Sequence, residues 1–422
     1  MNSRHLDLTT RMFADRTGRQ PAWRWHVPGR IEIFGKHTDY AGGASLVATV
    51  PRGFTVVAAP RDDRRVRVID ARHEVETVVD VDDPTPCRGW ANYATVTAHR
   101  LAMNFPGVEL GADIALASDL PRAAGVSSSS ALVVGLATAL LRRSGVDRTP
   151  VWSAEVTSLE DLAWYLGCVE NGLTYKSLAG TAGVGTQGGS QDHTAILGCR
   201  AGHVSHFAFI PVTRHADIPM PDDWMFVVLS SGVHADKAGS VRDRYNRGAV
   251  SVQALLRLWR DATGQAQPSL AAVLTGNAEA EARLRALART QVVEGFSAED
   301  LERRLTQLIG ELTRVPAAAT AFADADRAGV GALALASQHD AEALLGNQIP
   351  ETMALARLAR ENGAFAASAF GAGFGGSVWA LVDRNEADAF GARWLEAYQR
   401  ACHPTGQVEW FTCRPGDGVV EI

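Results

Sequence analysis

One stretch of small and hydroxyl-bearing residues has the composition of an anion site. Pro121–Leu141 begins with small residues, ends in an apolar run, and carries between them Gly125, Ser127, Ser128, Ser129 and Ser130. Small residues let backbone N–H groups converge on an anion, and a following helix adds free N–H groups and its positive dipole end. Serine hydroxyls can bind phosphate oxygens or Mg²⁺. Because a linker would not continue directly into strong helix formers, the stretch favours a triphosphate cradle over a flexible linker.

Two other segments carry polar side chains that could act on a ligand. Lys36, His37 and Asp39 follow a predicted strand that ends at Gly35, a position that suits a polar-ligand site and a solvated turn equally well. Asp192 follows the glycine-rich loop 172–189 after two residues. A lone aspartate there is usually a turn or helix-capping residue. Neither segment identifies a site by itself.

Two aromatic residues and a late glycine motif are also open to more than one interpretation. Trp90 and Tyr93 share one face of a predicted helix, which favours core packing and also fits the wall of an adenine pocket. Gly371, Gly373 and Gly376 match GxGxxG, but a helix-like segment precedes them and a strand follows. A dinucleotide fingerprint needs the reverse order. The motif is therefore interpreted as a tight backbone element that closes over phosphates or supports the cradle.

Alternating and helical patterns indicate the elements that must position these groups. Short strands separated by Gly, Pro and Asp clusters fill residues 44–82, a helix follows Trp90, and residues 112–117 form a strand before the cradle. From about residue 213 the pattern changes to one strong strand and long helical segments. This change predicts two domains, 1–212 and 213–422.

Composition limits the classes of protein that fit. The chain has 422 residues, enough for two cores, and a net charge of −6 without a basic run, so no nucleic-acid partner is expected. Five scattered cysteines predict neither a disulfide framework nor a zinc site and indicate a reducing compartment. The charged N-terminus is not a signal peptide, and no apolar run reaches membrane-spanning length. We expect a cytoplasmic protein without a membrane partner.

The motifs together resemble the GHMP family of small-molecule kinases, and most closely its galactokinase branch. The family patterns PGRxNxxGEHTDYxxG, PxxxGLSSSASL and GxGFGG are matched by residues 28–43, 121–132 and 371–376, and Trp90–Tyr93 also matches. The resemblance covers residues 27–382. It implies a two-domain α+β fold: a ribosomal-S5-like N-terminal α/β domain with a left-handed βαβ crossover, and a ferredoxin-like C-terminal α+β domain.

The resemblance also implies roles for the residues that perform the reaction. Asp192 falls on the catalytic carboxylate, and Arg30 on the arginine beside it. A carboxylate can accept the proton of an attacking sugar hydroxyl, and a cation offsets charge on the phosphoryl oxygens. Ser129 and Glu170 fall on the Mg²⁺ ligands, although the loop after Glu170 is about ten residues longer than usual.

The resemblance also implies which residues bind the two substrates, the sugar and the nucleotide. Those that fall on sugar-binding residues are Lys36, His37, Asp39, Gly189 and Tyr245. Those that fall on nucleotide-binding residues are Trp90, Tyr93, Gly125, Ser127, Ser128, Ser129, Ser130, Gly373 and Gly375. The departure from the family that matters most is Lys36, which replaces a glutamate that helps hold the sugar; Ser130 also replaces an alanine, which is a minor departure.

The resemblance implies an ATP- and Mg²⁺-dependent sugar 1-kinase that acts as a monomer on galactose or a close relative. A second interpretation keeps the chemistry and changes the sugar to a uronic acid, arabinose or another hexose, because lysine donates hydrogen bonds where glutamate accepts them. A third is a non-catalytic sugar sensor. The presence of Arg30 and Asp192 disfavours the sensor, which has no need of a base.

Overall fold

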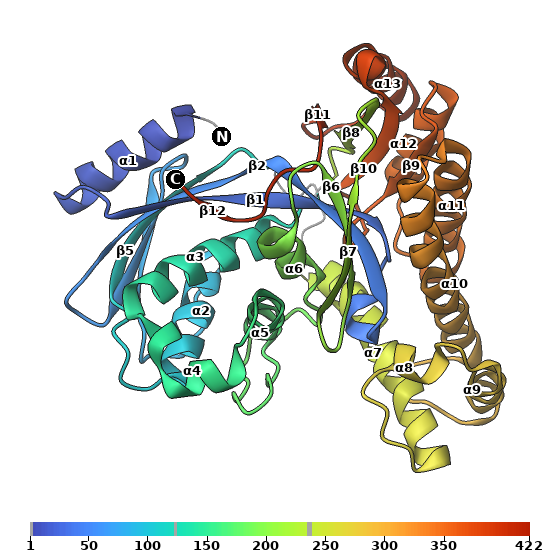
Figure 1. Cartoon of the computed structure of the whole chain (residues 1–422), viewed down its shortest axis with the longest axis horizontal. Coiled ribbons are helices and arrows are strands. Elements are labelled where there is room, and N and C mark those ends of the chain that lie inside the picture. The colour runs from blue at the N-terminus through green and yellow to red at the C-terminus, as the bar shows by residue number, and fades with distance from the viewer. Residues whose placement is uncertain (1–2, 122–124, 234–238) are drawn as a thin grey trace.

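The computed structural model of the chain describes residues 3–121, 125–233 and 239–422, which are arranged around two β-sheets (Figure 1). Residues 122–124 of the predicted cradle lie outside the described residues. The mixed sheet and helix content confirms the predicted α+β class. None of the helices in the described ranges combines the length and apolar character needed to cross a bilayer.

The first sheet carries most of the polar clusters noted in the sequence. Its strands are β1 (Trp23–Phe34), β2 (Ala44–Pro60), β3 (Arg65–Asp70), β4 (Val75–Asp80), β5 (Ala112–Ser118), β6 (His203–Ala208), β7 (Thr213–Pro219) and β12 (Val420–Glu421). Six strands follow the order β12-β1-β2-β5-β3-β4, while β6 pairs with the start of β2 and β7 with β6. The β3–β5 pair is parallel and the other pairs are antiparallel.

One predicted strand boundary is wrong. The sequence indicates two strands on either side of Pro51–Gly53, but β2 continues through them for 17 residues. A Cβ atom at Gly53 would lie 2.2 Å from the carbonyl oxygen of Val27, so the glycine permits close approach to β1. The pairing with β1 also shifts register just there, between Pro28 and Arg30. The glycine and proline therefore mark a bulge inside a strand pair.

Helices cover both faces of this sheet (Figure 1). One face holds α2 (Ala91–Asn104), α3 (Ser128–Ser144), α4 (Pro150–Glu155), α5 (Leu159–Asn171) and α6 (Gln191–Gly198). The predicted buried helix is confirmed as α3, which packs on β1, β2 and β5. On the other face lies α1 (Ser3–Thr17), whose Phe13 is fully buried against Val57 and Ala115. This helix closes a small core of its own.

The second sheet and its helices form the other half of the chain. Its strands are β8 (Trp224–Ser230), β9 (Ala366–Ala369), β10 (Ser377–Asp383) and β11 (Trp410–Cys413), in the antiparallel order β11-β8-β10-β9. The helices around it are α11 (Arg327–Asp340), α12 (Pro350–Glu361) and α13 (Ala387–Cys402). Buried Trp394 and Phe390 of α13 pack with β8 and β10 residues in one apolar cluster.

A helical unit with its own core adjoins both sheets at the lower right of Figure 1. It consists of α7 (Gly239–Thr263), α8 (Leu270–Leu274), α9 (Ala278–Thr290) and α10 (Ala298–Ala323). Leu255, Leu284 and Leu305 form its centre, and Tyr40 packs on them from the loop after β1. The long helix α10 also contacts β1, β2 and α11, so it joins the two halves of the molecule.

The predicted domain boundary between residues 212 and 213 stays a prediction. A division by sheets would fall later, because β7 still belongs to the first sheet and β8 opens the second. The chain also returns to the first sheet at β12, which pairs with β1.

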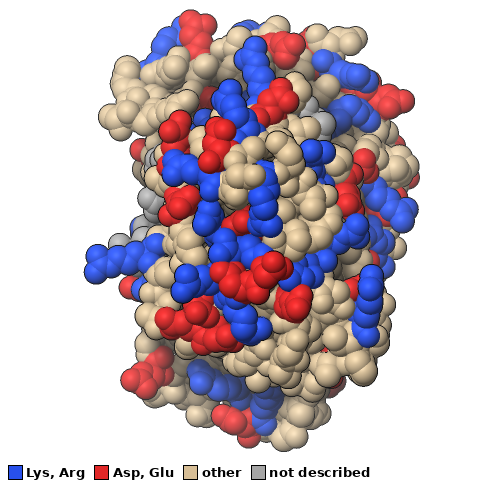
Figure 2. Space-filling view, turned by 90° about the vertical axis from the view of Figure 1, so that its left-hand side faces the viewer, with Lys and Arg blue, Asp and Glu red and all other residues tan. Residues whose placement is uncertain are grey.

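Charged side chains on the surface are mixed in sign. Figure 2 shows basic and acidic side chains interspersed over the face at the left of Figure 1. Ion pairs such as Arg64–Asp82 and Arg61–Asp63, each 2.6 Å long, lie beside β3. Exposed pairs of this kind contribute little to stability, so they do not determine the fold.

Candidate active site

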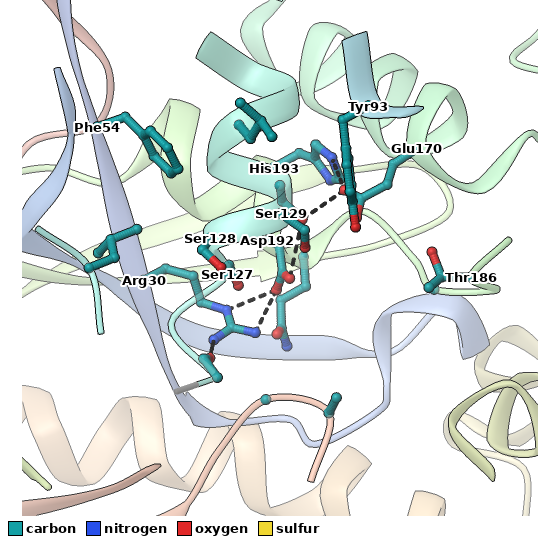
Figure 3. Close-up of a pocket in the computed structure, with 18 of the residues that line it drawn as sticks. Arg30, Phe54, Tyr93, Ser127, Ser128, Ser129, Glu170, Thr186, Asp192 and His193 are labelled. Carbon is teal, nitrogen blue, oxygen red and sulfur yellow. Dashed lines mark hydrogen bonds and ion pairs between the residues drawn. The ribbon is translucent and has the colours of Figure 1, made fainter. Parts of the chain in front are cut away.

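Most of the predicted sugar, phosphate and adenine residues line one cavity of about 610 Å³. Its middle is formed by Arg30, Asp192 and the serine loop, which point toward one another in Figure 3. One end is lined by His37, Asp39 and Tyr245. The other end is lined by aromatic and apolar side chains, among them Trp90, Tyr93, Phe54, Leu116 and Leu132. The cavity thus offers a polar pocket and an apolar pocket joined by a charged centre.

A close ion pair occupies the centre. Arg30 lies on β1 and Asp192 in the first turn of α6, 162 positions later. The Arg30 guanidinium donates from Nε and Nη2 to Asp192 Oδ1 at 2.8 and 2.6 Å. Its third nitrogen donates to the carbonyl of Gly125 at 2.6 Å, which fixes the guanidinium beside the serine loop. The Asp192 side chain keeps 20% of its surface exposed, so it remains accessible from the cavity.

The serine loop has the backbone geometry of an anion cradle. Gly125 and Ser127 have φ angles of 74° and 62°, and Ser127 immediately precedes α3. The Ser127 hydroxyl is buried and has no hydrogen-bond partner among the described residues. The N-terminus of the 17-residue helix faces the same space. An unpaired buried donor at a helix start fits a phosphate oxygen.

Ser130, regarded as a minor departure in the sequence, lies at a junction of three groups. Its hydroxyl donates to Glu170 Oε2 at 2.8 Å and lies 3.4 Å from Asp192 Oδ2. The same Glu170 oxygen is 2.9 Å from His193 Nε2. Ser130 therefore connects the predicted base with the predicted metal ligand, which an alanine would not do.

The long loop after α5 does not displace Glu170. The loop folds back on the helix end, where the Val184 N–H donates to the Glu170 carbonyl at 2.8 Å. Glu170 and Ser129 both line the cavity. In the described part of the chain, no three His, Cys, Asp or Glu side chains are grouped to hold a metal ion. Mg²⁺ bound to a nucleotide needs few protein oxygens, so Ser129 and Glu170 fit it, and their role as ligands stays a prediction.

The late glycine loop reaches the cavity through Gly371 rather than through the predicted Gly373 and Gly375. Gly371 and Ala372 line the cavity, whereas Gly373 and Gly375 do not. A Cβ atom on Gly373 would lie 2.2 Å from the carbonyl of Asn347, so this glycine permits close packing inside the second half of the chain. Gly371 instead approaches the Gly125 carbonyl. The loop therefore supports the cradle, and direct nucleotide contacts by Gly373 and Gly375 are not supported by their positions.

Four of the five predicted sugar residues converge at the polar end. A Cβ atom on Gly189 would lie 2.3 Å from Asp39 Oδ2, which explains the glycine. Asp39 accepts a hydrogen bond from the Gln191 N–H at 3.2 Å, and burial raises the pKa of its carboxyl. The rings of His37 and Tyr245 lie 5.6 Å apart. These groups form a compact polar wall beside Asp192.

Lys36 is the exception, and the expectation that it faces the sugar does not hold. Its side chain is 1% exposed and does not line the cavity. The ammonium donates to the hydroxyls of Ser337 on α11 and Ser368 on β9, both at 2.8 Å. Burial lowers the pKa of Lys36, and the Glu311 carboxylate opposes that shift. Lys36 thus ties the loop after β1 to the second half of the chain.

Glu32 lines the cavity and was not singled out from the sequence. Alternation along β1 could have revealed it, because Arg30 and Glu32 are two apart and share a face. It stands where the family pattern has asparagine. Its side chain is 3% exposed, and Oε1 has no hydrogen-bond partner among the described residues. Burial raises its pKa to about 8, with Arg30 and Lys36 opposing and Asp192 and Asp39 adding to the shift.

The raised pKa of Glu32 predicts a pH-dependent effect of Glu32→Gln on stability. Between pH 4.5 and 8 the folded wild type holds a proton on Glu32 that the unfolded chain has released, so the contribution of Glu32 to stability falls as pH rises. Glutamine does not titrate. The free energy of unfolding of Glu32→Gln, relative to that of wild type, should therefore rise by up to about 1.4 kcal/mol per pH unit between pH 4.5 and 8. Above pH 8 this difference should level off.

Urea unfolding of both proteins from pH 5 to 9 measures this effect. The exposed Glu279 supplies the matched control, Glu279→Gln. Parallel stability profiles for wild type and Glu32→Gln would show that Glu32 titrates alike in the folded and unfolded states.

The predicted adenine residues border both the core and the cavity. Trp90 and Tyr93 pack against the main apolar cluster and also line the cavity. Tyr93 is hydrogen-bonded to Ser129, and burial raises its pKa. In Figure 3, Phe54 lies across the cavity from Tyr93. The two interpretations of this aromatic pair, core and pocket wall, are therefore compatible.

Known family models match three segments of the chain. Residues 11–60 match the galactokinase galactose-binding signature, residues 92–163 the GHMP kinase N-terminal domain, and residues 318–400 the GHMP kinase C-terminal model. These segments contain the loop after β1, the cradle and the late glycine loop.

Curated relatives and solved structures agree with these matches. A galactokinase from Roseiflexus sp. is 29% identical and one from Exiguobacterium sibiricum 26% identical, each match covering 97% of this chain and 95% and 97% of the relative. The crystal structure of Lactococcus lactis galactokinase complexed with galactose superposes with a TM-score of 0.80 at 22% identity, covering 99% of this chain and all of the other. A homoserine kinase from Cytophaga hutchinsonii has a TM-score of 0.55 at 15% identity, covering 95% and 97%. The predicted two-domain α+β fold is confirmed.

Proposed function

Because the chain is a galactokinase-like member of the GHMP kinase superfamily, we propose that it transfers the γ-phosphate of ATP to the anomeric hydroxyl of galactose or a related sugar. The observation that carries this proposal is the Arg30–Asp192 pair, which lies between the polar end of the cavity and the serine loop. A sugar at the polar end and a triphosphate on the loop would meet at this pair. We further propose that the enzyme is a cytoplasmic monomer.

The reaction follows from the groups at the centre of the cavity. The anomeric oxygen forms a bond to the γ-phosphorus, the bond to the β,γ-bridging oxygen breaks, and ADP leaves with that electron pair. Asp192 accepts the hydroxyl proton. Arg30 stabilises the Asp192 carboxylate and offsets negative charge on the transferring phosphoryl group. Mg²⁺ held by Ser129, Glu170 and the phosphates would neutralise further phosphate charge.

The polar end provides the groups that would orient the sugar. Asp39 and His37 offer hydrogen-bonding atoms close to the Gly189 backbone, where a side chain would collide with Asp39. At the other end, Trp90 and Tyr93 would contact the adenine. Lys36 has no part in this proposal, since its amine is bound to serines outside the cavity.

A coupled ADP-release assay over a panel of free sugars tests the proposal. We expect rapid ADP formation with galactose or a close stereoisomer. A uronic acid, arabinose or another hexose as the best substrate would keep the chemistry and change the sugar. ATP and sugar binding without ADP release from any sugar would instead support the sensor interpretation and contradict the kinase.

Gly125→Val should weaken nucleotide binding at least about tenfold. Gly125 has a φ angle of 74°, and its added Cβ atom would lie 3.3 Å from the Phe370 carbonyl. A β-branched residue is strained there and would displace the loop that holds the phosphates. Calorimetric titration with ATP measures the change.

Gly107→Val is the matched control for backbone strain. Gly107 has a φ angle of 85° with no atom within 4 Å of its added Cβ, and it does not line the cavity. It should lose stability like Gly125→Val but keep its ATP affinity. Equal ATP affinity in wild type and folded Gly125→Val would count against the cradle.

A further inference from the structure

A second cavity, of about 250 Å³, adjoins the polar end of the first and is lined by four arginines. Arg244 and Arg247 come from α7, and Arg303 and Arg304 from α10. Among the described residues that line this cavity, Asp300 is the one carboxylate. Four guanidinium groups and one carboxylate give this cavity a net positive lining, and we call it the arginine pocket.

Arg304 is buried and incompletely paired. Its side chain is 4% exposed, and one terminal nitrogen donates to the His37 carbonyl at 2.7 Å and lies 3.3 Å from the Tyr40 hydroxyl. The other terminal nitrogen donates to Gln307. Its Nε has no hydrogen-bond partner among the described residues. A buried charged donor without a partner is costly, and an anionic oxygen in the pocket would satisfy it.

The other three arginines are held in ways that leave N–H groups free. The Arg244 guanidinium lies 4.5 Å above the Phe374 ring, and Arg303 donates to the Ala343 carbonyl at 2.9 Å. Arg247 lies 4.4 Å above the Phe296 ring and donates to the Gly295 carbonyl at 2.8 Å and to Asp300 at 3.0 Å. Stacking on a ring orients a guanidinium and leaves its edge available for carboxylate or phosphate oxygens.

The arginine pocket is continuous with the proposed sugar site. His37 and Tyr245 line both cavities. A substituent on the sugar that extends past these two rings would lie among the arginines. The main cavity, by contrast, has the acidic side chain of Asp39 at this end.

We propose that the arginine pocket binds a carboxylate or phosphate group next to the sugar site, a role that rests on the proposed function. The group is either a substituent of the sugar, as in a uronic acid or a sugar 6-phosphate, or a free anion that binds beside the sugar. The sequence suggested a uronic acid because of Lys36. In this proposal the arginines of the pocket, and not Lys36, would bind its carboxylate. A cavity of about 250 Å³ has room for a small anionic group.

Steady-state kinetics with galactose, galacturonic acid and galactose 6-phosphate test whether the anionic group is a substituent of the sugar. In the Arg244→Gln/Arg303→Gln double variant, kcat/KM for the anionic sugars relative to galactose should fall about 10- to 100-fold, because charge-assisted hydrogen bonds are lost. Arg257→Gln is the control: Arg257 is exposed on the same helix and does not line the pocket. The ratio of kcat/KM for the anionic sugars to kcat/KM for galactose should be the same in Arg257→Gln as in wild type.

Calorimetric titration with inorganic phosphate tests whether the pocket binds a free anion. Saturating ADP is present so that the cradle is occupied. A phosphate affinity that falls at least tenfold in the double variant but not in Arg257→Gln supports a free-anion site. The proposal is overturned when the substrate ratio and the phosphate affinity both match wild type in the double variant. If wild type phosphorylates no sugar, the proposed function fails, and the phosphate titration still decides whether the pocket binds anions.

Discussion

Asp192→Asn is expected to lower kcat on the best sugar by about 10²- to 10⁴-fold, the contribution typical of a positioned base. The amide cannot accept the hydroxyl proton, and it removes the negative partner of Arg30, which lies 2.6 Å away. ATP binding should persist, because the serine loop and the Gly125 contact of Arg30 do not depend on the carboxylate. Single-turnover kinetics with calorimetry on the same protein separate the two effects.

Ser190→Ala provides a matched control for this variant. Ser190 precedes α6, and its side chain makes no hydrogen bond to the helix. Its replacement should leave kcat within about twofold. Near wild-type turnover by a folded Asp192→Asn protein would show that another group accepts the proton.

Lys36→Glu is expected to destabilise the protein by about 3–5 kcal/mol rather than change its sugar preference. Lys36 is buried, bonds Ser337 and Ser368, and lies in the field of the Glu311 carboxylate. A glutamate would replace the buried cation with a second acid in a site that water does not reach. Equilibrium urea unfolding measures the loss of stability.

Lys36→Met separates charge from volume, because methionine keeps much of the apolar stem. It should lose less stability than Lys36→Glu, and neither variant should reorder the sugars in the ADP-release panel. A shift of preference toward galactose in a Lys36→Glu protein of wild-type stability would place Lys36 at the sugar after all.

Local sequence patterns were sufficient to predict several helices and strands, because such patterns depend on residues that are close together in the chain. The apolar run after Ser130 correctly predicted the buried helix α3, because nearly every residue in that run is apolar. The strand after the glycine motif near residue 371 was predicted correctly as β10, but the helix-like segment expected before the motif is wrong, because the strand β9 lies there. The sequence could not decide whether Trp90 and Tyr93 belong to the core or to the pocket wall, because they contact both the core and the cavity.

Side-chain direction at Lys36 could not be predicted from the sequence, for a physical reason. Strand alternation ends at Gly35, where φ is 95°, and His37 has a φ angle of 57°. Once the backbone enters the left-handed region, the period of two no longer tells which way a side chain points. The partners of Lys36 lie about 300 positions later, so only the tertiary fold shows them.

The arginine pocket was equally hidden, because α7 and α10 contribute its arginines from positions about 60 residues apart. In the sequence, the segment that contains Arg244 is only a charged run next to Tyr245. Helix packing converts it into one wall of a cavity. Tertiary structure, rather than any local pattern, brings these charges together.

The proposed phosphoryl transfer is tested most directly by ³¹P NMR of the products formed from ATP and the best sugar. The proposal predicts equimolar ADP and a sugar phosphate whose phosphorus couples to the anomeric proton. Both signals should vanish in Asp192→Asn on the same time scale. A phosphate ester at any other carbon, or ADP with inorganic phosphate alone, would contradict the assignment of Arg30 and Asp192 to an anomeric kinase.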